Sequence, residues 1–307
     1  MGVSTTWTGS LSSSYNTAGN WTNGVPVATG TAVIDGSVSI TGGVPSQPDV
    51  QRFYVARTYT GAIGSVGTPL ELDCSELSVD NNTSGSTHYI HLDGATYASK
   101  TVMVDGLKTG NALYLSGDLD LVIVESTFLG TVHLGNSASK VATVKDMTIM
   151  TSAGTVDASV PANVAFADNA LLYMTAGTFN IGENFGDNGT MTLTGGTINV
   201  NEWTVTSGGS TDSLIISGSG ATVNWNAGST GLTPSSINAV RTLTMVNGTF
   251  TTVSNEKAYV GLGTITQYGG TVNLQSPFPN IEINTAFNSY AGSFNAPKQS
   301  VLTTTAK

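Results

Sequence analysis

Charged side chains are scarce in this sequence. Only 10% of the 307 residues are charged, against about 25% in an average soluble domain. The ten Lys and Arg residues are outnumbered by twenty Asp and Glu residues, which gives a net charge of −10 at pH 7. A surface of this sign repels nucleic-acid phosphates and anionic lipid head groups. We therefore expect neither nucleic acid nor a membrane among the partners.

Cysteine is almost absent as well. The single Cys74 excludes an intramolecular disulfide and a multi-cysteine metal site. It lies in the strand-like run 70–77, which favours a buried, unreactive thiol over a nucleophile. No stretch approaches the roughly 18 apolar residues of a membrane-spanning helix. Residues 1–14 lack the basic and apolar regions of a secretory signal, so we expect no export.

Familiar catalytic and cofactor motifs are missing too. The sequence contains no GxxxxGK[ST], HExxH or GxSxG motif. His88 and His91 are three residues apart on an extended segment, so we expect their side chains on opposite faces of the strand. We therefore expect no metal site shared by the two histidines. The interpretation is a protein that is not an enzyme and needs no cofactor or metal.

The best carboxylate pair is Asp118 and Asp120. In a strand these two side chains share one face roughly 7 Å apart, which suits an inverting glycosidase or a calcium site. Simple alternation of polar and apolar residues produces the same pair in any half-buried strand, and no aromatic-rich segment surrounds it. Asp73 and Glu76 form a weaker pair. We assign no catalytic residue.

Glycine and small uncharged polar residues are abundant in place of charged residues. There are 37 glycines, and Ser, Thr and Asn supply most of the polar side chains. Thr and Val favour pleated strands, Gly and Asn accept the positive φ angles of tight turns, and Ser, Thr, Asn and Gly form helices weakly. The composition predicts an all-β protein.

A short unit recurs through the second half of the chain. It consists of a strand, a glycine, Thr or Ser, an apolar residue and usually Asn, as in 191–200 (MTLTGGTINV). Its copies begin at positions 130, 154, 177, 196, 221, 248, 270 and 292, about 23 residues apart on average. This period and composition fit the rung of a parallel β-helix better than a leucine-rich repeat or a propeller blade. We predict a single-stranded right-handed parallel β-helix.

Corresponding residues of successive rungs should stack about 4.8 Å apart. The apolar position of each copy then forms an inward-facing core column, made of Val132, Val156, Phe179, Ile198, Val223, Phe250, Val272 and Phe294. The next position, His133 and Asp157 in the first copies, becomes a polar ladder in which Asn180, Asn199, Asn224, Asn273 and Asn295 can exchange amide hydrogen bonds. The glycine of each unit should supply a positive φ at the bend between sheets.

The chain divides into three predicted segments. Residues 1–30 read as an N-terminal cap or docking segment, 31–296 as the β-helix and 297–307 as a C-terminal tail. Strand-like runs fill the first half, where Gly110 to Leu113 suggest an earlier, degenerate rung. Only 234–240 suits a short turn of helix. Trp7 and Trp21 either cover the first rung or form a binding surface for a partner.

The opening segment resembles a known family. Thr6-Trp7-Thr8-Gly9, followed by 15–26 (YNTAGNWTNGVP), is similar to the start of autotransporter-type β-helix passengers and of β-helical phage virion proteins. The resemblance covers some twenty residues and the rung style. It implies a β-helix behind a cap, and it carries over no catalytic residue. A missing export signal and a missing C-terminal membrane barrel favour the phage branch, whose proteins assemble in the host cytoplasm.

Three functions compete at this point. The first is a structural virion protein of a bacteriophage, a homotrimeric capsid decoration or cement protein that binds the major capsid protein on the virion surface. The second is a tailspike or adhesin that binds or cleaves a host glycan. The third is an ice- or crystal-binding solenoid, which needs regular Thr-x-Thr rows that the sequence breaks too often. We expect the first.

Overall fold

The computed structural model is all-β. It describes residues 2–43, 49–80, 85–92, 96–97, 100–123, 129–135, 141–151, 154–159, 164–181, 189–200, 211–227, 240–254, 260–275 and 281–296. These residues form 22 strands and one 3-10 helix, Ala18–Asn20. No described helix has the length and apolar character needed to cross a membrane. Two predicted segments, 297–307 and most of 234–240, lie outside the described residues.

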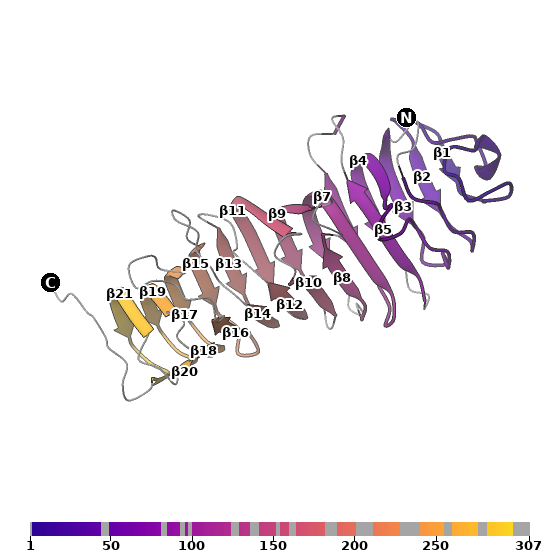
Figure 1. Cartoon of the computed structure of the whole chain (residues 1–307). Coiled ribbons are helices and arrows are strands. Elements are labelled where there is room, and N and C mark those ends of the chain that lie inside the picture. Colours follow the sequence, from indigo (N-terminus) through magenta and orange to yellow (C-terminus); the bar gives the residue numbers. More distant parts are fainter. Residues whose placement is uncertain are drawn as a thin grey trace. The chain divides into compact units, whose positions relative to one another are not determined.

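The chain forms two compact units. Unit 1 comprises residues 1–157 and 162–164, and unit 2 comprises residues 158–161 and 165–307. In each unit the strands pair in parallel and the chain coils through two ladders of strands, which makes the fold a parallel β-helix, or β-solenoid (Figure 1). The fold class predicted from the repeat is confirmed.

Unit 1 contains two ladders. Ladder 1A consists of β1 (Ser4–Thr6), β2 (Thr31–Ile34), β3 (Asp49–Val55), the second half of β4 (Leu70–Val79), β6 (Thr101–Val104), the second half of β7 (Ala112–Ile123) and β9 (Ala142–Ile149). Ladder 1B consists of the first halves of β4 and β7 with β5 (Thr87–Leu92), β8 (Thr131–Leu134) and β10 (Thr155–Ala158). The long strands β4 and β7 therefore take part in both ladders.

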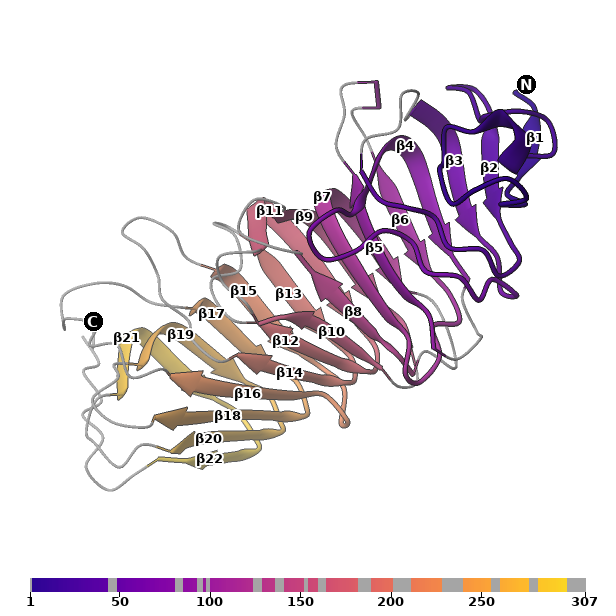
Figure 2. The same cartoon turned by 45° about the vertical axis from the view of Figure 1, so that its right-hand side comes forward.

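Unit 2 is more regular. Ladder 2A consists of β11 (Val164–Met174), β13 (Thr190–Leu193), β15 (Thr211–Ile216), β17 (Val240–Met245), β19 (Val260–Gln267) and β21 (Ile281–Ser289). Ladder 2B consists of β12 (Thr178–Ile181), β14 (Thr197–Val200), β16 (Thr222–Ala227), β18 (Thr249–Ser254), β20 (Thr271–Gln275) and β22 (Ser293–Asn295) (Figure 2). Glycines with φ between 71° and 95° join the two ladders, at positions 177, 196, 248, 270 and 292.

The core consists of in-register columns. In unit 2, Phe179, Ile198, Val223, Phe250 and Val272 follow one another and are at most 1% exposed, while Phe294 at the last rung is partly exposed. In unit 1 the corresponding column is Ile40, Ile63, His88, Leu113, Val132 and Val156. Leu113 thus belongs to a true rung. A side chain on the wrong face would lose about 1.5–3 kcal/mol of burial, which fixes the register.

Candidate functional site

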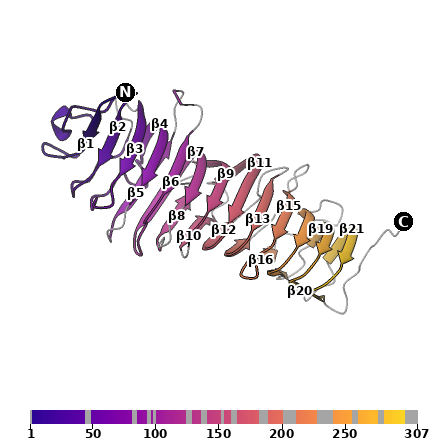
Figure 3. The ribbon, with the colours of Figure 1, turned by 180° about the vertical axis from the view of Figure 1, so that it is seen from behind.

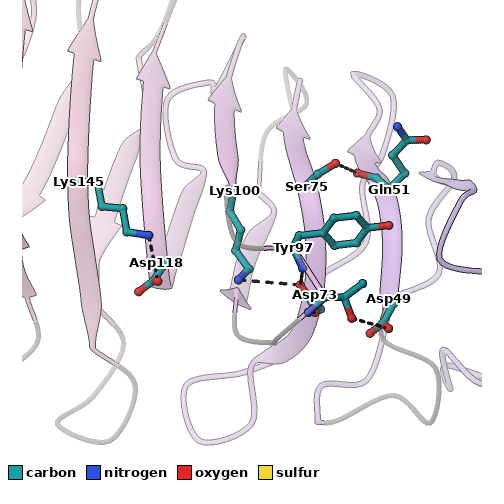
Figure 4. A network of polar contacts seen from close by, with 9 residues as sticks. Asp49, Gln51, Asp73, Ser75, Tyr97, Lys100, Asp118 and Lys145 are labelled. Atoms are coloured by element: carbon teal, nitrogen blue, oxygen red, sulfur yellow. Dashed lines mark hydrogen bonds and ion pairs between the residues drawn. The ribbon is translucent and has the colours of Figure 1, made fainter.

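A largely buried polar network of unit 1 surrounds Asp73 in β4. Asp49 and Asp73 are in-register neighbours, and the hydroxyl of Thr96 donates to Asp49 Oδ2 over 3.0 Å. The backbone N–H groups of Thr96 and Tyr97 donate to Asp73 over 2.7 and 3.4 Å. Lys100 Nζ lies 3.9 Å from Asp73 Oδ1 (Figure 4).

This network is suited to anchoring rather than to catalysis. The side chains of Lys100 and Asp73 are only 5% and 3% exposed, so the ammonium neutralises the carboxylate away from water. The Tyr97 hydroxyl donates to the carbonyl of Ala28 and ties the same segment to the start of the chain. The neighbouring Cys74 is buried, and burial raises the pKa of its thiol to about 12. The thiol is therefore protonated at neutral pH.

The predicted carboxylate pair lies on the outer face of β7. Asp118 Oδ2 lies 3.2 Å from Lys145 Nζ, and its side chain is half exposed (Figure 4). Asp120 is in register with Asp146. Burial raises the pKa of Asp120, as do the charges of Asp146 and Asp118, while Lys145 lowers it. These groups form a surface charge cluster. Among the described residues no three His, Cys, Asp or Glu side chains are grouped to hold a metal.

The histidines of β5 face different surroundings. His88 is fully buried in the core column, where its ring stacks on Tyr59 with centroids 5.7 Å apart. Burial lowers its pKa to about 4. His91 Nδ1 lies 2.7 Å from the hydroxyl of Ser116. The two rings serve separate structural contacts, as the alternation of the strand indicated.

An aromatic column lies on the outer face of ladder 1B, one position along each strand from the core column. Tyr89, Tyr114 and His133 are in-register neighbours whose rings stack with centroids 4.4 and 4.3 Å apart. His133 Nδ1 then lies 3.2 Å from Asp157 Oδ2. His133 and Asp157 were predicted from the repeat to share this column. The two tyrosines were not, because the repeat is degenerate at 110–113, just before Tyr114, and is not recognisable around Tyr89.

The polar ladder of unit 2 occupies the equivalent face of ladder 2B. Asn199 donates to Asn180 over 2.9 Å and Asn224 donates to Asn199 over 3.0 Å. Asn295 donates to Asn273 over 2.7 Å, while Thr251 takes the asparagine position in β18 and accepts from Asn273 over 3.5 Å. These side chains therefore satisfy one another along the solenoid axis.

Hydroxyl groups line both ladders of unit 2. In ladder 2B the column Thr178, Thr197, Thr222, Thr249, Thr271 and Ser293 is continuous, and it lies beside the asparagines. In ladder 2A the Thr-x-Thr pairs of β13, β17 and β19 are interrupted by Ser213 and Ile215 in β15. Neither ladder forms the uninterrupted Thr-x-Thr rows of the third hypothesis.

The tryptophans of the cap are core residues. Trp7 and Trp21 are 2% and 4% exposed, and their rings meet edge to face with centroids 5.2 Å apart. Their indole N–H groups donate to the carbonyls of Val38 and Tyr15. Both indoles are thus inaccessible, which corrects the interpretation of Trp7 and Trp21 as a direct docking surface. A nearby pocket of about 150 Å³ is lined by Ser14, Tyr15, Asn16, Thr41, Gly42, Gly43 and Leu70, without any charged group.

Comparisons with protein-family models, curated proteins and solved structures found no match to this chain.

Proposed function

We propose that the chain is a structural virion protein of a bacteriophage, a homotrimeric decoration or cement protein that binds the major capsid protein. In this proposal the protein assembles in the host cytoplasm and lies on the virion surface. The observation that carries the proposal is the mutual engagement of outward polar groups along the solenoid, typified by Asn180, Asn199 and Asn224. Such groups rigidify a scaffold and leave little chemistry for a substrate.

The uncharged outward side chains among the described residues of unit 2 support the homotrimer. In unit 2 the outward residues of ladders 2A and 2B that the structure describes, such as Thr190, Thr192, Thr222 and Asn224, carry hydroxyl, amide or apolar groups and no charge. A chain of net charge −10 repels its own copies most weakly through such faces. Hydroxyls and amides both donate and accept, so identical faces can pair with one another.

The proposal is tested by sedimentation with particles. Purified protein is mixed with phage particles from the source and centrifuged through a density gradient, and its solution mass is measured by light scattering. We expect a trimer that remains bound to particles. A soluble monomer that never sediments with a particle would contradict the proposal.

A glycan-binding tailspike or adhesin is the second candidate, and one observation favours it. Tyr268 and Tyr290 are 54% and 71% exposed, and their rings are nearly parallel with centroids 5.2 Å apart. Exposed aromatic surface of this kind can pack against sugar rings. Release of oligosaccharides from host polysaccharide by the wild type, but not by an Asp118→Asn, Asp120→Asn double variant, would establish glycan cleavage.

A further inference from the structure

A buried ion pair joins two successive rungs of unit 1. Asp73 lies in β4, and Lys100 directly precedes β6, the next strand of ladder 1A (Figure 3). Lys100 Nζ lies 3.9 Å from Asp73 Oδ1, and the two side chains are 5% and 3% exposed. Removing an ammonium and a carboxylate from water is costly. A reaction that eliminates both charges would therefore relieve this part of the cost of folding.

The carboxylate of Asp73 is buried because another segment of the chain lies over it. Leu72 and Cys74 are buried in the core, so alternation along β4 points the side chain of Asp73 to the outer face of the ladder. On that face, Thr96 and Tyr97 cover Asp73, and their backbone N–H groups donate to its carboxylate. This covering segment keeps water away from a side chain that would otherwise face solvent.

The two carboxylate oxygens of Asp73 have different surroundings. Thr96 N donates to Oδ2 over 2.7 Å. Oδ1 is the oxygen that lies 3.9 Å from Lys100 Nζ, and it accepts a longer bond of 3.4 Å from Tyr97 N. A short backbone hydrogen bond to one oxygen stabilises the negative charge that develops there when a nucleophile adds to the carboxyl carbon. Oδ1 is then the oxygen placed to leave.

The neighbouring carboxylate of Asp49 holds this donor in place. Asp49 is in register with Asp73 and accepts the hydroxyl proton of Thr96 over 3.0 Å (Figure 4). Thr96 is thus bound to Asp49 through its side chain and to Asp73 through its backbone. Groups that are fixed in this way before a reaction need no reorganisation when charge develops. The folded chain therefore presents the amine, the carboxyl group and the stabilising donor together.

We propose that Lys100 and Asp73 condense to an intramolecular isopeptide bond once the chain has folded. A proton passes from the ammonium of Lys100 to the carboxylate of Asp73, and the resulting amine attacks Cγ. The Nζ–Cγ bond forms and the Cγ–Oδ1 bond breaks. Oδ1 leaves as water with two of the three ammonium protons, and the third stays on the amide nitrogen.

The fold supplies what this condensation needs. Holding two reacting groups together replaces an encounter in solution by a step within one molecule, which raises its rate greatly. The flexible stem of Lys100 allows Nζ to approach Cγ. Because the site excludes water, it also protects the amide from hydrolysis. No oxidant or reductant takes part, and the product links two rungs of ladder 1A covalently.

Mass spectrometry of the intact, purified chain tests the proposal. The wild type should be lighter than its calculated mass by one water, and the Asp73→Ala and Lys100→Met variants should keep their full calculated mass. In the Asp73→Asn variant the same attack releases ammonia, so its mass should equal that of the linked wild type. Lys145 and Asp118 are the matched control, because they lie closer, at 3.2 Å, but are 41% and 50% exposed. Lys145→Met should leave the loss of water unchanged.

Peptide mapping locates the bond. Digestion of the wild type should give a branched peptide that contains both Asp73 and Lys100, and trypsin should not cleave after Lys100. A wild-type chain of full calculated mass would overturn the proposal. So would a loss of water that persists in Lys100→Met, or one that maps to a succinimide instead of a branched peptide. No particle or second copy takes part, so the result is independent of the sedimentation test.

Discussion

Each of the two units is a parallel β-helix, but their surface chemistry differs. Residues 1–157 hold 19 of the 30 charged side chains, although they make up about half of the chain. There, neighbouring rungs are joined by unlike pairs, such as Arg52 with Glu76 over 2.7 Å and the stacked rings of Tyr114 and His133. In unit 2 the rungs are joined by like pairs, the amides of the asparagine ladder.

The difference shows that a parallel β-helix constrains its interior more than its faces. Both units keep a buried and largely apolar column, occupied by Leu113 in one and Phe250 in the other. The outward columns need only residues that tolerate a neighbour about 4.8 Å away. Amides, aromatic rings and opposite charges all meet that condition. Unit 1 uses aromatic rings and opposite charges, and unit 2 uses amides.

The largest expected effect lies in the shared core. Phe250→Ala should lower the free energy of unfolding by about 3–5 kcal/mol, and Leu113→Ala by about 2–5 kcal/mol, because each leaves a cavity in a column. Urea denaturation measures both. Phe294→Ala, on a partly exposed ring, is the control and should cost less. Equal, small losses in all three variants would show that the columns are not the core.

The second-largest expected effect is a pH dependence of stability that arises in unit 1. Burial lowers the pKa of His88 to about 4 from the ordinary value of 6.5, so the unfolded chain binds a proton that the folded chain excludes between these values. Stability should therefore fall by roughly 3 kcal/mol as the pH drops from about 6.5 to about 4. His88→Leu should remove this part of the pH dependence, measured by denaturation at several pH values. An unchanged profile would contradict the burial of an uncharged imidazole.

The asparagine ladder should give a smaller effect. Asn199 donates to Asn180 and accepts from Asn224, so Asn199→Ala removes two hydrogen bonds and should cost about 1–2 kcal/mol. Asn295→Ala removes one bond at the end of the ladder and should cost about half as much. Denaturation at low and high salt should give the same loss. A strong salt dependence would indicate an electrostatic origin instead.

The smallest effect belongs to the ion pairs of unit 1. The side chains of Lys145 and Asp118 are 41% and 50% exposed, so Lys145→Met should change stability by less than about 1 kcal/mol. The change should shrink further in high salt because the pair is solvent-screened. A loss comparable to that of Asn199→Ala would show that charged pairs carry as much weight as the amide ladder.

The same difference explains how far the sequence predicted the structure. Like pairs repeat the same residue at a fixed interval, so the core column and the asparagines of unit 2 were visible as a period. Unlike pairs leave no repeat. The stack of Tyr114 on His133 was therefore missed. The long strands β4 and β7, which take part in two ladders each, could not be recognised as such.

The remaining differences between the predictions and the structure concern side-chain burial and pairing. Trp7 and Trp21 were compatible with either a cap core or a binding surface, and their burial and their hydrogen bonds to Val38 and Tyr15 distinguish the two. The pairing of Lys100 with Asp73 had no sequence signal, because the two residues are 27 positions apart in segments without a common motif. The carboxylates Asp118 and Asp120 were found by alternation, which could not identify Lys145 as the partner.

The in-register stacking of rungs is tested most directly by a disulfide cross-link. Thr197 and Thr222 are in-register neighbours on the outer face of ladder 2B, about 4.8 Å apart, a separation that a disulfide spans. Thr197 and Asn224 are two residues out of register, about 8 Å apart, beyond its reach. Under mild oxidation, the Thr197→Cys, Thr222→Cys variant should form an intramolecular disulfide, seen by mass spectrometry, and the Thr197→Cys, Asn224→Cys variant should not. Cross-linking of the second pair instead of the first would contradict the stacking on which the columns depend.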